Sequence, residues 1–321
     1  MSMHGPFEIS EESAVRLLHT SGNPSGLPNS DVVRPILNAL EIARRPERRW
    51  VVAFPPQSDV ADACLYHAPF EFVRSSVKPV RDLNHRKSYR DHWWIHGEAR
   101  PAMLDAINEL TRCIATPRVG KHRLFIWVPT CVLPSDATVA FSSTEDWFFG
   151  VLHSRLHELW ALKTGTRLET RPRYTPTTCF ETFPFPKPTD AKREAISEAA
   201  RELDQLRCAW LNPPEWTREE ILEFPGSANG PWRRYVHDPD ARGIGTVRYP
   251  RQVPRDADCA KHLAKRTLTN LYNERPTWLD LAHRRLDTAV FAAYNWDPAL
   301  TDDQLLEKLL TLNLERAAAE K

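Results

Sequence analysis

The alternation of basic and acidic residues between Arg167 and Tyr174 is the stretch of this chain with the most evident chemistry. It reads Arg167-Leu-Glu169-Thr-Arg171-Pro-Arg173-Tyr174, and in an extended segment the four charged side chains would share one face. Arginine donates in pairs to guanine O6 and N7, whereas a carboxylate accepts from cytosine N4. Glu169 and Arg171 could therefore read one C·G pair, while Arg173 and Tyr174 hold the nearby backbone. Alternatively, Glu169 and an arginine form an exposed ion pair that contributes little to stability. The residues alone do not decide between base reading and such an ion pair.

A second basic group follows Cys113 in the sequence Cys-Ile-Ala-Thr-Pro-Arg-Val-Gly-Lys-His-Arg-Leu-Phe-Ile-Trp-Val. Apolar residues on both sides predict two strands, and the run 124–128 predicts a central one. Arg118, Lys121, His122 and Arg123 then occupy the connecting loop and the start of the strand. A loop on a rigid sheet presents its side chains in fixed positions, which suits contacts to phosphates. A solvated basic loop without a ligand is the other interpretation.

Basic and aromatic residues also alternate in the stretch 80–96, where Arg86, Lys87 and Arg90 surround Tyr89 and precede two tryptophans. Such interleaving suits a nucleic-acid surface, because arginines contact phosphates while rings pack or stack. The competing interpretation places the aromatic rings in the core, with the alkyl parts of the arginines covering them.

Candidate catalytic motifs are weaker. Asn212-Pro213-Pro214-Glu215 resembles the Asn-Pro-Pro-aromatic signature of adenine-N6 methyltransferases, but a glutamate stands in the aromatic position. The motif also follows a predicted helix rather than an apolar strand, and no Gly-rich loop for S-adenosylmethionine precedes it. We interpret it as incidental to catalysis.

Histidine and serine chemistry gives no clearer site. His153 and His157 lie four residues apart on a predicted helix and could bind a metal, although no third ligand is evident. Packing or hydrogen bonding within the core is the favoured role for both. The sequence has no Gly-x-Ser-x-Gly nucleophile motif.

A long apolar helix must position the alternating stretch. Ser143 or Thr144 can cap it, and acidic residues in the first turn complement the helix dipole. Apolar positions recur at helical spacing to Trp160, and Gly165 predicts the helix end. Earlier in the chain, the apolar run 50–54 predicts a strand, and Pro101 predicts the first turn of a helix that ends near Leu110. After residue 188 the chain predicts a long amphipathic helix, a loop-rich section over 212–258, and two further helices. One runs from about 261 to 294, with Pro276 as a point where it can be interrupted, and the other starts at a Thr301-Asp-Asp-Gln capping box.

Composition is that of an ordinary globular protein, with 41% hydrophobic and 26% charged residues and a net charge of +1. This charge excludes a strongly basic coat, although a local basic stripe is enough to bind phosphates. No apolar run is long enough to cross a bilayer. The six cysteines are scattered and the N-terminus lacks a secretory pattern, so we expect a cytoplasmic protein with reduced thiols.

Several long phrases of the sequence together resemble one known family. FFGVLHS, RPRYTPTTCFETFPFP and ATPRVGKHRLFIWVP are similar to the target recognition domain of MmeI-type adenine-specific DNA methyltransferases, the large enzymes of bacterial restriction–modification systems. Further similarity occurs near the start, in SDVVRPILNALEIARRPERRWVV, and near the end, in TLTNLYNERPTWLDLAHRRLDTAVFAAY. The resemblance therefore covers nearly the whole chain.

The resemblance implies an α+β fold, with a mixed-sheet target recognition domain over 1–188 and a mostly helical C-terminal domain over 189–321. It implies binding of double-stranded DNA for an adenine-N6 methyltransferase, present as another domain or a partner subunit. S-adenosylmethionine would belong to that methyltransferase part, and we expect no cofactor in this chain. The expected DNA-binding residues are the basic and ribbon residues named above: Arg86, Lys87, Arg90, Arg118, Lys121, His122, Arg123, Arg167, Glu169, Arg171, Arg173 and Tyr174. A free-standing nucleic-acid-binding protein without an enzymatic partner is the alternative.

Overall fold

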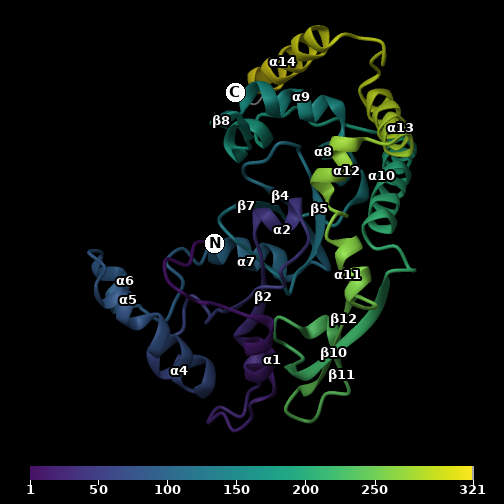
Figure 1. Cartoon of the computed structure of the whole chain (residues 1–321). Coiled ribbons are helices and arrows are strands. Elements are labelled where there is room, and N and C mark those ends of the chain that lie inside the picture. Colours follow the sequence, from purple (N-terminus) through teal and green to yellow (C-terminus); the bar gives the residue numbers. More distant parts are fainter. Residues whose placement is uncertain (320–321) are drawn as a thin grey trace.

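Two hydrophobic cores organise the fold, and each is built from segments that are far apart in the sequence. The structure is a computed structural model that describes residues 1–319. The first core lies in the lower part of Figure 1, around β2 and the long β10–β12 hairpin. The second lies above it, around β4 and the helices at the upper right. Small mixed and antiparallel sheets with many helices confirm the predicted α+β class.

A four-stranded mixed sheet forms the centre of the first core, in the order β1-β3-β2-β6. Its strands are β1 (Glu8–Ile9), β2 (Val33–Leu37), β3 (Trp50–Val52) and β6 (Leu133–Pro134). β2 pairs antiparallel with β3 and parallel with β6. The apolar run predicted as a strand near residue 50 is therefore confirmed as β3, which is buried throughout.

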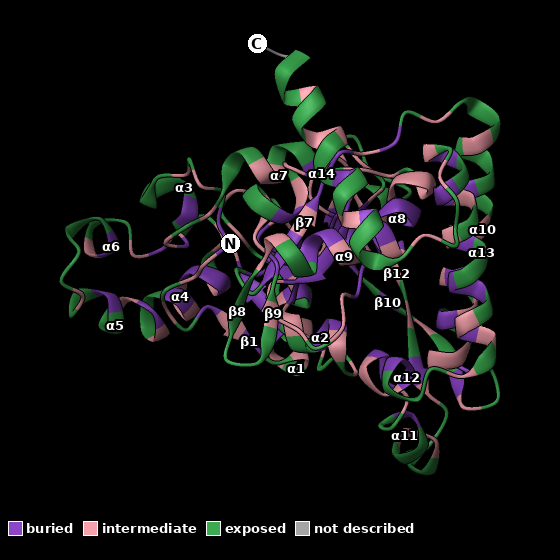
Figure 2. Cartoon of the chain, turned by 90° about the horizontal axis from the view of Figure 1, so that it is seen from above, coloured by how far each residue is buried: buried purple, intermediate pink, exposed green. Residues whose placement is uncertain are grey.

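Helices cover this sheet and extend from it. The helices are α1 (Glu11–His19), α2 (Ala39–Ala43), α3 (Val60–Cys64), α4 (His67–Ser76), α5 (Lys78–Asp82) and α6 (Lys87–Asp91), with a 3-10 turn at Asn29–Asp31. Phe70 and Val73 of α4 are buried in the first core. α5 and α6 project from the body of the molecule in both views (Figures 1 and 2).

An antiparallel sheet of order β5-β4-β7 supports the second core. Its strands are β4 (Arg112–Pro117), β5 (Ile126–Pro129) and β7 (Thr138–Phe141), preceded by α7 (Pro101–Asn108). The proline at the start of α7 occupies the position that the sequence predicted. β4 lies at the centre, so the residues after it and before β5 form a loop at one edge of a rigid sheet.

The predicted apolar helix is two helices, α8 (Asp146–His153) and α9 (Arg155–Thr164), separated at Ser154. The Ser154 side chain accepts from the His157 amide, so one serine ends α8 and caps α9. Gly165 ends α9, as expected. A Cβ at Gly150 would lie only 2.7 Å from Ile196 Cγ2 of the next long helix, so glycine permits close packing there.

Four of the five helices after residue 188 pack on the second core. They are α10 (Asp190–Leu211), α12 (Leu268–Glu274), α13 (Thr277–Tyr294) and α14 (Asp302–Ala319), and the fifth, α11 (Ala257–Leu263), precedes α12 in the chain. The helix predicted over 261–294 is three helices. The interruption expected at Pro276 is confirmed, because α13 begins directly after it, and a second break separates α11 from α12. The capping box is confirmed, because the Thr301 amide donates to Gln304 Oε1 at 2.9 Å.

The section predicted as loop-rich over 212–258 is instead a long antiparallel hairpin. β10 (Thr217–Ser227) pairs with β12 (Ile244–Pro254) along its whole length, and the short β11 (Val236–His237) adds a third strand. Prolines and arginines obscured the alternation that buries Leu222 and Phe224. Those prolines are tolerated because β10 is an edge strand and β11 covers only part of β12.

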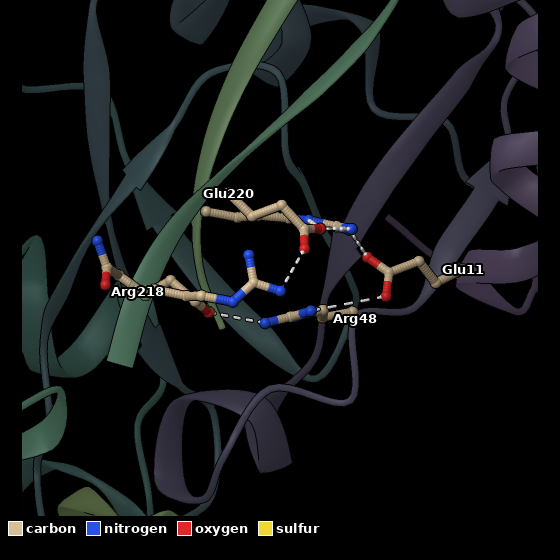
Figure 3. Close-up of polar contacts among 6 residues, drawn as sticks. Glu11, Arg48, Arg218 and Glu220 are labelled. Carbon is tan, nitrogen blue, oxygen red and sulfur yellow. Dashed lines mark hydrogen bonds and ion pairs between the residues drawn. The ribbon is translucent and has the colours of Figure 1, made fainter. Parts of the chain in front are cut away.

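The hairpin returns to the first core, so the cores do not divide at residue 188. Phe224, Trp232 and Val247 pack with Trp50 and Val33, whereas helices on either side of the hairpin complete the second core. An ion-pair network fixes the hairpin to the N-terminal part (Figure 3). In it, Arg251 bridges Glu11 and Glu220, and Arg48 contacts Glu11 at 3.7 Å. No helix among residues 1–319 is long and apolar enough to cross a membrane.

Candidate nucleic-acid interface

The alternating stretch after α9 is a two-stranded hairpin rather than one extended ribbon. β8 (Thr166–Leu168) pairs with β9 (Arg171–Arg173), with Leu168 opposite Arg171 and Arg167 opposite Pro172. Opposite residues in an antiparallel pair lie on the same face, so Arg171 and Arg173 share one face while Arg167 lies on the other. The expectation that all four charged side chains share one face is therefore wrong, because the chain reverses after Leu168. Figure 2 colours almost the whole hairpin as exposed.

Glu169 occupies the tip of this hairpin in an unusual backbone conformation. Its φ is 56°, in the left-handed region that two-residue hairpin turns normally fill with glycine, asparagine or aspartate. Its carboxylate accepts from Arg171 Nη2 at 2.9 Å. Both side chains remain accessible, 73% for Glu169 and 53% for Arg171. The pair therefore stands at the outermost point of the hairpin, free to exchange its internal contact for an external partner.

The basic loop between β4 and β5 lies directly beside the hairpin. The Tyr174 amide donates to the Arg118 carbonyl at 2.7 Å, and the Gly120 amide donates to the Pro172 carbonyl at 3.2 Å. Val119 and Arg173 form a β-bridge. These main-chain bonds join two predicted groups that are about fifty residues apart in the sequence into one surface, which we call the loop–hairpin surface (residues 118–122 and 166–173).

Asn273, at the end of α12, completes the loop–hairpin surface and was not expected from the sequence. Its Oδ1 accepts from Lys121 Nζ at 2.5 Å and lies 2.9 Å from His122 Nε2. A single asparagine thereby holds two side chains of the basic loop. No local sequence signal indicated it, because the contact joins residues that are 152 positions apart.

Arg118 is half-buried at the base of this loop. Its Nε is buried and has no hydrogen-bond partner among residues 1–319. A buried donor without an acceptor is uncommon in native structures, and a ligand is one way to satisfy it. Together with Lys121, His122, Arg167 and Arg173, it gives the loop–hairpin surface several groups that can donate to phosphate oxygens.

Two expected contact residues face the interior instead, which corrects their predicted role. Tyr174 is 1% exposed, and its hydroxyl is 3.0 Å from His157 Nε2. Burial raises the pKa of this tyrosine. Arg123 donates to the Thr116 hydroxyl and the Pro117 carbonyl, and its guanidinium lies 4.9 Å from the Tyr174 ring centre. Both residues hold the loop–hairpin surface on the second core rather than project from it.

The two helix histidines belong to the same supporting layer. His153 Nε2 lies 3.0 Å from the Phe125 carbonyl, and His157 Nδ1 lies 2.9 Å from the Leu152 carbonyl. Burial lowers the pKa of His157 to about 3 and that of His153 well below its ordinary value. Packing and hydrogen bonding were the favoured role for both. No cluster of three or more metal-ligating side chains occurs within residues 1–319.

The third basic group lies on the projection made by α5 and α6, apart from the loop–hairpin surface (Figure 1). Arg86 and Lys87 are exposed there, whereas Arg90 is partly buried and donates to the Asn84 and His85 carbonyls at 2.6 and 3.1 Å. The interleaved rings are not available for stacking on bases. Tyr89 and Trp94 are buried, and Trp93 packs on Phe70. The core interpretation is thus correct for the aromatic residues.

The Asn-Pro-Pro motif forms the connection from α10 to β10. Asn212 Oδ1 accepts from Arg45 Nη1 at 2.8 Å. The Pro213 carbonyl accepts from the Thr217 hydroxyl at 2.9 Å and from the Trp216 amide at 3.0 Å. The side-chain and carbonyl acceptors of this motif are therefore engaged in shaping a turn.

Comparisons with known proteins agree with the geometry. Residues 23–187 match the family described as MmeI, target recognition domain. DNA methyltransferase A of Bacillus subtilis (strain 168) is 28% identical over 266 residues, which make up 78% of this chain and 24% of that protein. The structure of the Type IIL restriction-modification enzyme MmeI in complex with DNA shares the fold, with a TM-score of 0.63 and 18% identity over 99% of this chain.

This chain is much shorter than these relatives, since it corresponds to 24% of the methyltransferase and 35% of the MmeI chain. The family match nevertheless includes the basic loop, both helices α8 and α9, and the β8–β9 hairpin. It extends over more than half of the residues and confirms the resemblance seen in the sequence. The chain belongs to the family of MmeI target recognition domains.

Proposed function

We propose that this chain recognises a specific sequence in double-stranded DNA on behalf of an adenine-N6 methyltransferase of a restriction–modification system. The observation that carries the proposal is the β8–β9 hairpin, which presents an acid–arginine pair at its tip beside a basic loop. Family membership and the names of the two relatives support the same assignment.

The tip has the chemistry required to read a C·G pair in the major groove. Glu169 would accept from cytosine N4, while Arg171 would donate to guanine O6 and N7. A glutamate in the left-handed region costs backbone energy that glycine would avoid, and such strain is often retained at functional positions. In free protein the two side chains satisfy each other, which keeps both in place before DNA arrives.

The surrounding groups would hold the DNA backbone. Arg118, Lys121, His122, Arg167 and Arg173 lie on the loop–hairpin surface and would position the duplex without reading its sequence. Arg86 and Lys87 on the α5–α6 projection would contact phosphates farther along the duplex. Arg90, Arg123 and Tyr174 would contribute indirectly, by holding the loops that carry the contacting residues.

Methylation itself would be carried out by a methyltransferase domain or subunit that holds S-adenosylmethionine and acts on a flipped adenine. The small share of each relative that this chain covers is consistent with such a division of labour. Copurification or reconstitution with a methyltransferase would establish the partner. Site-specific adenine methylation that requires both components would be the supporting result.

The binding function can be tested with the chain alone. A duplex pool with a randomised segment, followed by sequencing of bound DNA, should yield one defined site, and single-stranded competitor should be a poor inhibitor. Arg171→Ala should relax preference at one base pair, whereas Lys121→Gln should weaken binding to all sequences alike. Lys261→Gln, on the exposed surface of α11, serves as the charge-matched control and should have no effect. Enrichment of no sequence above background would refute sequence recognition.

A further inference from the structure

A cavity of about 240 Å³ lies in the first core, in a different part of the fold from the loop–hairpin surface. It is bounded by β2, the segment 53–57 that follows β3, α7, and the turn 229–233 between β10 and β11. Its polar lining includes Asp31, Arg34, Asn108 and Arg233.

Arg34 is the unusual member of this lining, because it is a buried charge without a counter-ion. Only 7% of the residue is exposed, and within residues 1–319 no carboxylate forms an ion pair with it. Its Nε donates to the Cys131 carbonyl at 2.9 Å and its Nη2 to the Thr130 carbonyl at 2.7 Å. Its Nη1 makes no hydrogen bond within the described residues. Burial lowers the pKa of this arginine to about 10, so it remains charged at neutral pH.

Two other buried arginines have more hydrogen-bond or ion-pair partners than Arg34. Arg81 donates to four main-chain carbonyls, those of Met3, His4, Tyr89 and Ile95. Arg207 donates to the Phe125 carbonyl at 2.8 Å and lies 3.7 Å from the Asp204 carboxylate, although its Nε has no hydrogen-bond partner within residues 1–319. Arg34 donates to only two carbonyls and has no carboxylate partner within the described residues, and it lines the cavity.

Asp31 gives an independent sign of a missing partner in the same cavity. Its Oδ2 accepts from the Ser227 hydroxyl at 2.8 Å, but its Oδ1 is buried and has no hydrogen-bond partner within residues 1–319. A Cβ on Gly230 would come within 2.6 Å of this oxygen, so only glycine fits against that side of the carboxylate. One cavity thus contains a cation without an anion and an acceptor without a donor, and buried polar groups are rarely left so.

We propose that this cavity binds a small oxyanion, a phosphate or carboxylate group, whose carrier also offers a hydrogen-bond donor. Arg34 donates to the anionic oxygens through Nη1, and Arg233 adds a second positive charge on the lining. Asp31 Oδ1 accepts from the donor, a hydroxyl or an amino group. Such charge-assisted bonds are strong in a desolvated site. The phosphate can belong to a free metabolite or to a DNA backbone, and the experiment separates these sources.

The test measures the thermal unfolding midpoint at constant ionic strength while inorganic phosphate, or acetate as the carboxylate probe, replaces chloride. Ligand binding to the native state should raise the midpoint saturably, by about 2–5 °C at saturation for a chain of this size. Arg34→Gln should abolish the rise. Leu104→Trp, which fills the cavity from α7 without changing a charge, should abolish it too and decides the result if Arg34→Gln does not fold. Arg242→Gln, at an exposed residue that does not line the cavity, should keep it.

Duplex binding by Leu104→Trp identifies the source of the oxyanion. An unchanged DNA affinity supports a free oxyanion, whereas a tenfold loss together with loss of the phosphate effect supports a backbone phosphate. The proposal is overturned if neither probe raises the midpoint of the natural protein saturably, or if Leu104→Trp responds to phosphate as the natural protein does. Either failure leaves the proposed recognition function of the β8–β9 hairpin untouched, because that function is measured by base preference.

Discussion

Exchange of the two charges at the hairpin tip is the most direct test of base reading. If Glu169 and Arg171 read one C·G pair, Glu169→Lys alone puts a donor against the cytosine amino group. Arg171→Asp alone puts an acceptor against the guanine acceptors. The double variant restores complementarity to the inverted pair, lysine to guanine and aspartate to cytosine. We therefore expect the double variant to prefer G where the natural protein prefers C.

The structure separates the effect on DNA from the effect on folding. The Glu169–Arg171 ion pair is exposed, so its loss should cost only about 0.2–1 kcal/mol of unfolding free energy. Loss of the matching base contact should cost about 1–3 kcal/mol at that base pair, a factor of roughly 5 to 150 in affinity. Lysine and glutamate face the same backbone constraint at position 169, so the substitution adds no large conformational cost.

Binding to duplexes that differ only at this base pair, measured by fluorescence anisotropy at fixed salt, gives the preference, and thermal unfolding gives the stability. Glu169→Gly is a matched control, because glycine relieves the left-handed strain of about 1 kcal/mol while removing the acceptor. It should be at least as stable as the natural protein and yet lose the preference. If the double variant folds normally but binds no sequence, these residues hold phosphates and do not read bases.

The supporting contacts give four further predictions. Lys121→Gln should weaken binding to all duplexes and reduce the salt dependence of the binding constant by about one unit of slope. Arg123→Gln removes an internal support and should chiefly lower the unfolding midpoint. Equal stability of the two variants would contradict this difference. Asn273→Ala should weaken duplex binding through the freed loop while unfolding is unchanged, and Asn273→Asp should keep the loop contacts in place but repel phosphates. His157 stays neutral in the folded protein but is protonated in the unfolded chain. Its contribution to the unfolding free energy is therefore lost as pH falls from about 6.5 towards its folded pKa of about 3. Between pH 5 and 4, the unfolding free energy of His157→Gln, measured with urea, should fall by about 1.4 kcal/mol per pH unit less than that of the natural protein. Arg251→Met should lower the unfolding free energy by about 1–3 kcal/mol, because it leaves two partly buried glutamates without their shared partner. Arg248→Met, on the exposed face of the same strand, is the control and should lower it by less than about 1 kcal/mol.

Local patterns in the sequence were enough to predict buried strands and helix ends, because these features depend on neighbouring residues. The apolar runs predicted β3 and a strand near 124–128, where Ile126–Pro129 forms β5, because buried strands need continuous apolar residues. The expected central position of the second strand is wrong, because β4 lies between β5 and β7 and β5 is at the edge. Pro101, Gly165 and the Thr301–Gln304 box marked helix ends through rules that act within one turn. The length and order of the matching phrases also identified the family, which the family match over residues 23–187 confirms.

Only the tertiary structure decided which of the charged and aromatic residues face outward. Arg123 and Arg118 belong to one basic loop, yet the first is turned inward by two oxygen acceptors and the Tyr174 ring. Three further features depend on main-chain or side-chain contacts with distant parts of the chain. They are the turn at Glu169, the helix break at Ser154 and the hydrogen bonds from the basic loop to Asn273. The residues next to a position in the sequence indicate its polarity and its local secondary structure. The direction of its side chain is determined by contacts across the whole fold.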